Sequence, residues 1–151
     1  MYIKGIGMTK FGLDNNSSQK MIYEASFEAL EDADMSPDDM DAIVLSTTDS
    51  AINGERQRLM GPVINSLLQT KKPVIRIPAV CGGGGAALWS ALKMKHDNVL
   101  VIGFERLVSS SSELRTDEIL MGSERIYEQA EGMIFPAQNA LVAQQHFLRY
   151  G

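Results

Sequence analysis

The residues best placed to do chemistry are one cysteine and the four glycines that follow it. Cys81 is the only cysteine among 151 residues, and it is followed directly by Gly82–Gly85. An apolar run precedes Cys81 and an alanine- and leucine-rich run follows, which predicts a strand ending at a helix N-terminus. The free N–H groups and positive dipole end of a helix favour a thiolate there. The same N–H groups suit an oxyanion formed by attack on a carbonyl carbon.

Other interpretations of this stretch stay open from the residues alone. A lone cysteine can be a small buried apolar residue, and glycines can allow close packing of a helix. Each glycine costs a helix about 1 kcal/mol relative to alanine, which makes four in a row expensive for packing alone. A phosphate cradle is the third interpretation. The phosphate-loop pattern is absent, however, because the first lysine after the glycines is Lys93, and Lys10 occupies the third glycine position of a dinucleotide motif.

The two histidines offer no clear partner for the thiol. His96 follows a predicted helix, where a cationic side chain is favourable, and His146 lies in the last predicted helix. Either one is a candidate general base for Cys81, and nothing in the sequence selects between them. They lack the spacing of a metal pair, so we expect no metal site.

The elements that would position Cys81 alternate along the chain. We expect a short strand within Tyr2–Gly12, then a helix capped by Ser17 or Ser18 that ends near Asp32, and then a short helix from Ser36. A strand at 42–48 follows, and after it a helix with Val63, Ile64, Leu67 and Leu68 on one face. The last expected elements of this region are a strand at 73–80, a helix at 84–95 and a strand at 98–107. This order is typical of a parallel α/β sheet, and the continuous apolar strands predict that both faces are covered.

The last third of the chain has a different character. Residues 108–118 form a polar, serine-rich run that predicts a loop, 119–130 are loosely helical, and a helix begins near Pro136. We therefore expect an α/β core at 1–107 and a separate region at 108–151.

Composition excludes several classes of function. The net charge is -5, which disfavours non-specific nucleic-acid binding because phosphates require a basic face. No apolar run approaches the about 18 residues of a membrane span, and "MYIKGIG" does not resemble a signal peptide. One cysteine cannot form an internal disulfide, so we expect a cytoplasmic protein.

Four stretches together resemble the thiolase family. They are "YIKGIGMTKFG", "IPAVCGGGGAALWSAL", "VLVIGFERL" and "FPAQNALVAQQHFLRYG", in the order and spacing of archaeal and sterol-carrier-protein-type acetyl-CoA acetyltransferases. The resemblance covers essentially the whole chain. It implies the N-terminal half of a thiolase, with a mostly parallel mixed sheet covered by helices and incomplete without a second segment.

The resemblance also implies roles for individual residues. Cys81 would be the nucleophile that takes the acyl group, with its own backbone N–H in an oxyanion hole. Residues 108–151 would cover the active site, and Met133 and Phe135 would be candidate pocket residues, with core packing as the alternative for each. Acyl-CoA and CoA would be substrates, with no cofactor.

The glycines next to the nucleophile include a departure from the family. Gly83 and Gly84 would lie against substrate, yet thiolases often carry a serine at the position of Gly83. The acid–base histidines and the second cysteine of thiolases belong to the second half, which this chain does not match.

The implied function is transfer of an acyl group from acyl-CoA to Cys81, followed by condensation with, or release by, CoA substrates. It would require a complementary C-terminal thiolase part, in a homo- or hetero-oligomer. Partners known for the family are hydroxymethylglutaryl-CoA synthase and an OB-fold protein. The alternative is a non-catalytic thiolase-like subunit that serves assembly or acyl-CoA channelling.

Overall fold

The structure is a computed structural model that describes residues 2–12, 16–48, 57, 59–106 and 112–151, with the backbone alone at 112–115. The chain divides into two compact units, residues 1–109 and 110–151. In the described part of the chain, no helix has the length and apolar character needed to cross a membrane.

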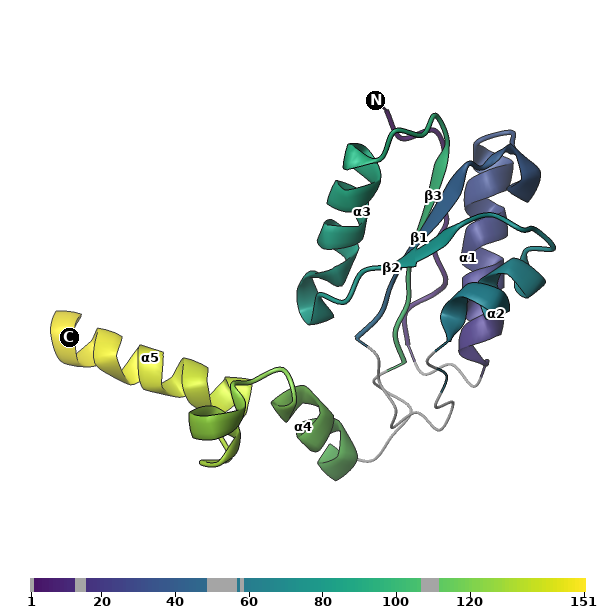
Figure 1. The fold of residues 1–151 in the computed structure, drawn as a ribbon. Coiled ribbons are helices and arrows are strands. Elements are labelled where there is room, and N and C mark those ends of the chain that lie inside the picture. Colours follow the sequence, from purple (N-terminus) through teal and green to yellow (C-terminus); the bar gives the residue numbers. More distant parts are fainter. Residues whose placement is uncertain (1, 13–15, 49–56, 58, 107–111) are drawn as a thin grey trace. The chain divides into compact units, whose positions relative to one another are not determined.

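The first unit is built on a three-stranded parallel sheet (Figure 1). The strands are β1 (Ala42–Ser46), β2 (Val74–Arg76) and β3 (Val99–Gly103), in the order β2-β1-β3. Both pairings are parallel, with Ile43 opposite Val74 on one side and opposite Leu100 on the other. The predicted α/β class is confirmed, although all three strands are shorter than expected. No antiparallel pair occurs among the described residues, so the mixed character of a complete sheet stays a prediction.

Helices cover both faces of the sheet, as the continuous apolar strands predict. Helix α3 (Gly83–Lys93) lies on one face, while α1 (Ser18–Asp32) and α2 (Met60–Leu67) lie on the other (Figure 1). All five residues of β1 are buried, since it is the central strand between two helical layers. Two clusters form the core: Ile22, Leu30, Met40, Ile43, Leu45, Met60, Ile64, Leu68, Leu100 and Ile102 on the α1 and α2 side, and Val44, Ala87 and Ala91 under α3.

The helix starts expected from the sequence are confirmed. The Ser17 side chain accepts a hydrogen bond from the Lys20 N–H and caps α1. Ser36 and Asp39 form a capping box around the 3-10 helix Pro37–Asp39, and the bonds that Asp39 accepts from Ser36 hold its pKa below the ordinary value.

Asp41 fastens the start of β1 to the segment that leads into β3. Its Oδ2 accepts the backbone N–H groups of Asn98 at 3.0 Å and Asp97 at 2.9 Å. These two bonds stabilise the carboxylate, so the pKa of Asp41 is lowered from its ordinary value. A single side chain thereby helps fix the register of the two strands.

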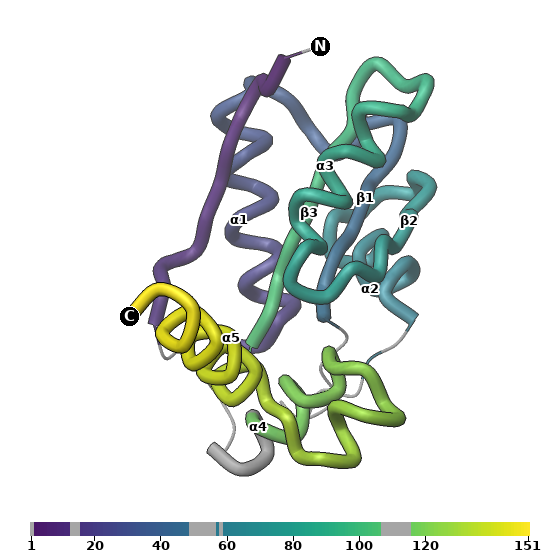
Figure 2. The backbone as a smooth tube through the Cα atoms, turned by 90° about the vertical axis from the view of Figure 1, so that its left-hand side faces the viewer, coloured from purple at the N-terminus to yellow at the C-terminus, as the bar shows by residue number. Residues whose placement is uncertain are grey.

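The short strand expected within Tyr2–Gly12 is wrong for the described residues, which carry no strand there. The backbone N–H groups of Ile6 and Met8 donate instead to the carboxylates of Asp32 and Glu28, each at 2.9 Å. This segment lies alongside α1 (Figure 2). The alternating pattern of this segment therefore accompanies packing on a helix surface and not pairing in the sheet.

Close approach of this segment to α1 requires glycine at position 7. A Cβ there would lie 2.1 Å from the Ala25 carbonyl oxygen and 2.6 Å from the Ala29 nitrogen. We expect Gly7→Ala to lower the free energy of unfolding by about 1–3 kcal/mol, because helix backbone cannot yield as a flexible side chain does. Hydrogen exchange of the Ile6 and Met8 amides should accelerate.

Gly61→Ala is the matched control for this substitution. The nearest atom to a Cβ at position 61 is the Val74 Cβ at 3.8 Å, an ordinary contact. Equal thermal midpoints and amide protection for the Gly7 variant and the parental chain would show that the segment does not depend on this contact.

The second unit contains α4 (Ser112–Leu120), a π-helix (Arg125–Gln129) and α5 (Phe135–Tyr150). The loop expected through residue 118 is wrong from Ser112 onward, where α4 begins. The expected helix near Pro136 is confirmed, with the proline in its first turn. Glu124 caps the π-helix by accepting the N–H groups of Ile126 and Tyr127.

Candidate functional site

Cys81 lies beyond the carboxyl end of β2, in the 3-10 turn Val80–Gly82 that leads into α3. It is exposed. Because β1, β2 and β3 are parallel, their carboxyl ends meet at one edge of the sheet. Ligands of open α/β sheets bind outside this edge. The fold therefore presents the thiol where a small-molecule site is expected.

The turn around Cys81 contains a strained backbone. Val80 has φ +41°, a conformation rare for a β-branched residue. The Gly82 N–H donates to the Ala79 carbonyl at 2.8 Å and the Gly83 N–H donates to the Val80 carbonyl, and the Cys81 N–H takes part in neither bond. Strain of this kind concentrates at functional sites. The geometry is compatible with the predicted oxyanion role of the Cys81 N–H, which stays a prediction.

The strand before Cys81 is less buried than its apolar sequence predicts. Strand β2 is only half-buried, because the order β2-β1-β3 places it at the edge of the described sheet. The backbone strain of the turn does not lie at the glycines. Gly82 has φ -83° and Gly83 has φ -57°, both ordinary values, and the strained position is Val80.

The four glycines differ in their environments. A Cβ at Gly82, Gly84 or Gly85 would meet no heavy atom within 4 Å in the described residues. Gly83 alone is buried, and a Cβ there would lie 2.1 Å from the Ser46 Oγ. Packing within the first unit thus explains why glycine occupies position 83. It does not explain the glycines at positions 82, 84 and 85. Open space above Gly84 suits the predicted contact with substrate, which stays a prediction.

Ser46 accounts for the departure of Gly83 from the thiolase pattern. A serine at position 83 carries the same Cβ that would overlap the Ser46 hydroxyl. Glycine is therefore the residue that fits beside Ser46 in this chain. The close contact with Ser46 is compatible with glycine at position 83.

A carboxylate that the sequence analysis did not single out lies at the same edge. The Glu105 Oε2 accepts the Thr48 N–H at 2.8 Å, the Thr48 hydroxyl, and the Thr47 hydroxyl at 3.3 Å, and Oε1 accepts the Arg106 N–H at 3.0 Å. These residues follow β1 and β3 directly. Polar residues just after two parallel strands were the signal that could have revealed the cluster, since such strands end at one edge.

Glu105 joins the ends of β1 and β3, so its replacement has a testable effect. In Glu105→Gln an amide NH2 replaces one of the two acceptor oxygens, so at least one of the donors from Thr47, Thr48 and Arg106 loses its bond. We expect the free energy of unfolding to fall by about 1–3 kcal/mol. Urea unfolding measures this change. Glu24→Gln is the control, because Glu24 is exposed and makes an ion pair with Lys20 on the surface of α1. An equal, near-zero effect of both substitutions would contradict the structural role of Glu105.

Neither histidine is placed beside Cys81 by the first unit. His96 is exposed beyond the C-terminus of α3, whereas Cys81 precedes the N-terminus of that helix. Eleven helical residues span about 16 Å, so His96 is not a direct base for the thiol. His146 belongs to α5 in the second unit, where its ring lies 4.9 Å from that of Tyr150.

Met133 and Phe135 lie in the second unit and are partly buried there. The Met133 carbonyl accepts the Gln138 Nε2 at 2.8 Å and the Ser123 hydroxyl at 3.4 Å. The Phe135 ring packs against Gly122, where a Cβ would lie 3.2 Å from its Cζ. These contacts give both residues a packing role within the unit. Their predicted place in an acyl pocket stays a prediction.

Comparisons with known proteins found similarities to parts of longer proteins. The chain is 30% identical to an acetyl-CoA acetyltransferase of Methanothermobacter thermautotrophicus, over 97% of its own length and 39% of that protein. No family profile matches. Among solved structures, 3-oxoacyl-[acyl-carrier-protein] synthase III of Aquifex aeolicus is similar, with a TM-score of 0.55 and 28% identity. That similarity covers 66% of this chain and 34% of the synthase. The chain thus spans well under half of each protein it resembles.

Proposed function

Since these relationships support an N-terminal part of a thiolase-family protein with a thiolase-like fold, we propose that the chain acts in acyl transfer of the acetyl-CoA C-acetyltransferase type. The observation that carries the proposal is the exposed Cys81 on a strained turn between β2 and α3, at the carboxyl edge of a parallel sheet. An exposed thiol at such an edge is accessible to a thioester.

The proposed first step is covalent. The Cys81 thiolate attacks the carbonyl carbon of acyl-CoA, and the tetrahedral intermediate collapses as the bond to the CoA sulfur breaks. CoA leaves as a thiolate that takes up a proton, and the acyl group remains as a thioester on Cys81. The Cys81 backbone N–H is proposed to stabilise the oxyanion of this intermediate.

The second step requires groups outside this chain. A base from the complementary part is proposed to deprotonate a second acyl-CoA at the carbon next to its carbonyl. The carbanion attacks the acyl thioester, a carbon–carbon bond forms, and the Cys81 thiolate leaves. Thiolysis by CoA is the reverse. No redox cofactor enters this scheme, because no electrons are transferred to or from the substrates.

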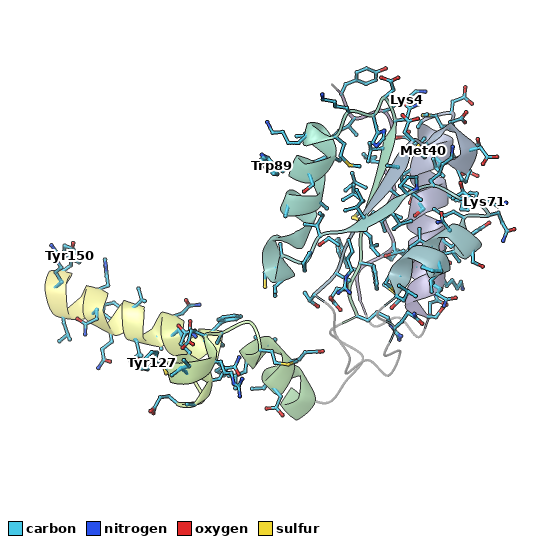
Figure 3. All side chains as sticks on the ribbon, viewed as in Figure 1. Lys4, Met40, Lys71, Trp89, Tyr127 and Tyr150 are labelled. Carbon is cyan, nitrogen blue, oxygen red and sulfur yellow. The ribbon has the colours of Figure 1, made fainter. Side chains whose placement is uncertain are left out.

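An apolar face of α3 supports the need for a complementary part. Leu88, Trp89 and Leu92 are 42%, 62% and 48% exposed on the side of α3 that faces away from the sheet. Trp89 is labelled there in Figure 3. The opposite side carries the buried Gly83, Ala87 and Ala91. Three large apolar side chains side by side on one helix are typical of a surface that another segment covers. Association with hydroxymethylglutaryl-CoA synthase and an OB-fold protein is proposed on the family resemblance alone.

Acylation of Cys81 by acetyl-CoA tests the proposal, with intact-mass measurement as the readout. A gain of one acetyl group on this chain is expected. Slow alkylation of Cys81 together with no acyl adduct would contradict the catalytic proposal and favour a non-catalytic thiolase-like subunit.

A further inference from the structure

One buried side chain contacts both ends of the segment that carries Cys81. Ser46 is the last residue of the central strand β1 and is 2% exposed. Its hydroxyl donates a hydrogen bond to the Ile77 carbonyl at 3.0 Å. At the other end of the segment, the buried Gly83 lies so close that a Cβ would be 2.1 Å from the Ser46 Oγ. Residues 78–82 therefore bridge two points fixed on the same side chain.

The hydrogen bond from Ser46 extends the pairing of β1 with the chain after β2. The Ile77 N–H donates to the Leu45 carbonyl at 2.8 Å, and the Ile77 carbonyl then accepts the Ser46 hydroxyl. The Ser46 side chain thus holds Ile77, the residue just after β2, against the end of β1.

Contact with Gly83 fixes the other side of the turn. Gly83 is the first residue of α3, and among the described residues it is the only one of the four glycines whose Cβ would meet another atom within 4 Å. Both atoms that such a Cβ would meet belong to Ser46, namely Oγ at 2.1 Å and Cβ at 3.3 Å. The approach of α3 to the end of β1 is therefore set by this pair.

We propose that Ser46 and Gly83 act together as positioning residues that place the Cys81 turn at the carboxyl edge of the sheet. This inference rests on the proposed acyl transfer for its functional meaning. Ser46 holds the strand side of the turn and Gly83 holds the helix side, so the Val80–Gly82 turn keeps its strained form. Displacement of a nucleophile by about 1 Å can reduce a rate a hundredfold.

Four variants of the full chain test this pair, each purified together with its complementary part. Gly83→Ala introduces the overlap, Ser46→Ala removes the hydrogen bond, and Ser46→Gly with Gly83→Ala removes both atoms that the new Cβ meets. Gly61→Ala is the control, because it makes the same exchange near the start of α2, outside the Cys81 turn, and the nearest atom to the new Cβ is the Val74 Cβ at an ordinary 3.8 Å. The readouts are the alkylation rate of Cys81 by iodoacetamide, its pH profile, and acetyl transfer from acetyl-CoA.

All rates are measured at a temperature well below the thermal unfolding midpoint of each variant. A variant that is only less stable is then still folded and should react at the parental rate. We expect Gly83→Ala to slow both reactions by about ten- to a hundredfold and Ser46→Ala by about two- to tenfold. The double variant should recover to the level of Ser46→Ala, which also lacks the hydrogen bond, and Gly61→Ala should match the parental rate. If Gly83→Ala acted only by loosening the packing of α3 in general, the second substitution would not restore the rates.

Parental rates in Gly83→Ala would overturn the inference. If Gly83→Ala does not fold, Ser46→Ala decides, since it adds no atom, and a parental rate in it overturns the inference equally. Failure of the proposed function looks different: the parental chain then gives no acetyl adduct, while the alkylation rates still measure the placement of the thiol.

Discussion

Acetyl-CoA is expected to transfer one acetyl group to Cys81, and Cys81→Ala is expected to reduce this transfer by about 10⁴-fold or more. The reason is chemical: the thiolate is the nucleophile, and no other side chain of the turn can form the thioester. Because the chain contains one cysteine, a single added acetyl group that hydroxylamine removes identifies the modified residue directly. Cys81→Ser keeps the size of the side chain and tests whether the sulfur itself is required.

His96→Ala is the matched control for the cysteine variants. His96 is exposed at the far end of α3, so its loss should leave acetyl transfer unchanged. Iodoacetamide should modify Cys81 rapidly near neutral pH, and acetyl-CoA should protect it. An acetyl adduct that persists in Cys81→Ala would place acylation elsewhere and would contradict the assigned nucleophile.

Local signals in the sequence predicted the elements around the site well. The structure confirms the caps at Ser17 and Ser36, which depend on neighbouring residues only. It also confirms the strand that begins at Ala42, although this strand ends at Ser46, two residues before its expected end. The same holds for the start of α3 within one residue of its expected position. Capping and apolar runs act over a few residues, so a single sequence contains them.

Features that depend on distant parts of the chain could not be predicted. The edge position of β2 follows from strand order, and the backbone around Gly7 packs on α1 instead of pairing in the sheet. The contact of Ser46 with Gly83 joins residues 37 positions apart, as the numbers show. In each case the partner is chosen by tertiary packing, which local pattern does not record.

The exposed face of α3 leads to the second large expected effect. Expressed alone, the chain is expected to be poorly soluble, because the large apolar side chains of Leu88, Trp89 and Leu92 lie exposed on α3. Replacing Leu88 and Leu92 together by glutamate should raise the monomeric fraction of the isolated chain. The same variant should weaken binding to the complementary part by about a hundredfold or more, since burial of each leucine contributes about 1.5–3 kcal/mol.

Lys95→Glu separates this effect from charge alone, because Lys95 is exposed just after α3 and lies outside the apolar face. It should change neither solubility nor assembly to a comparable extent. Light scattering after size exclusion measures the monomer, and co-purification with a polypeptide bearing Gly-His-Pro-like and Cys-x-Gly-like motifs measures assembly. A parental chain that is already a monodisperse, cooperatively melting monomer would contradict the need for a covering segment. In that case the apolar face of α3 would not need a complementary part to cover it. Cys81 would then have to react without a general base from such a part.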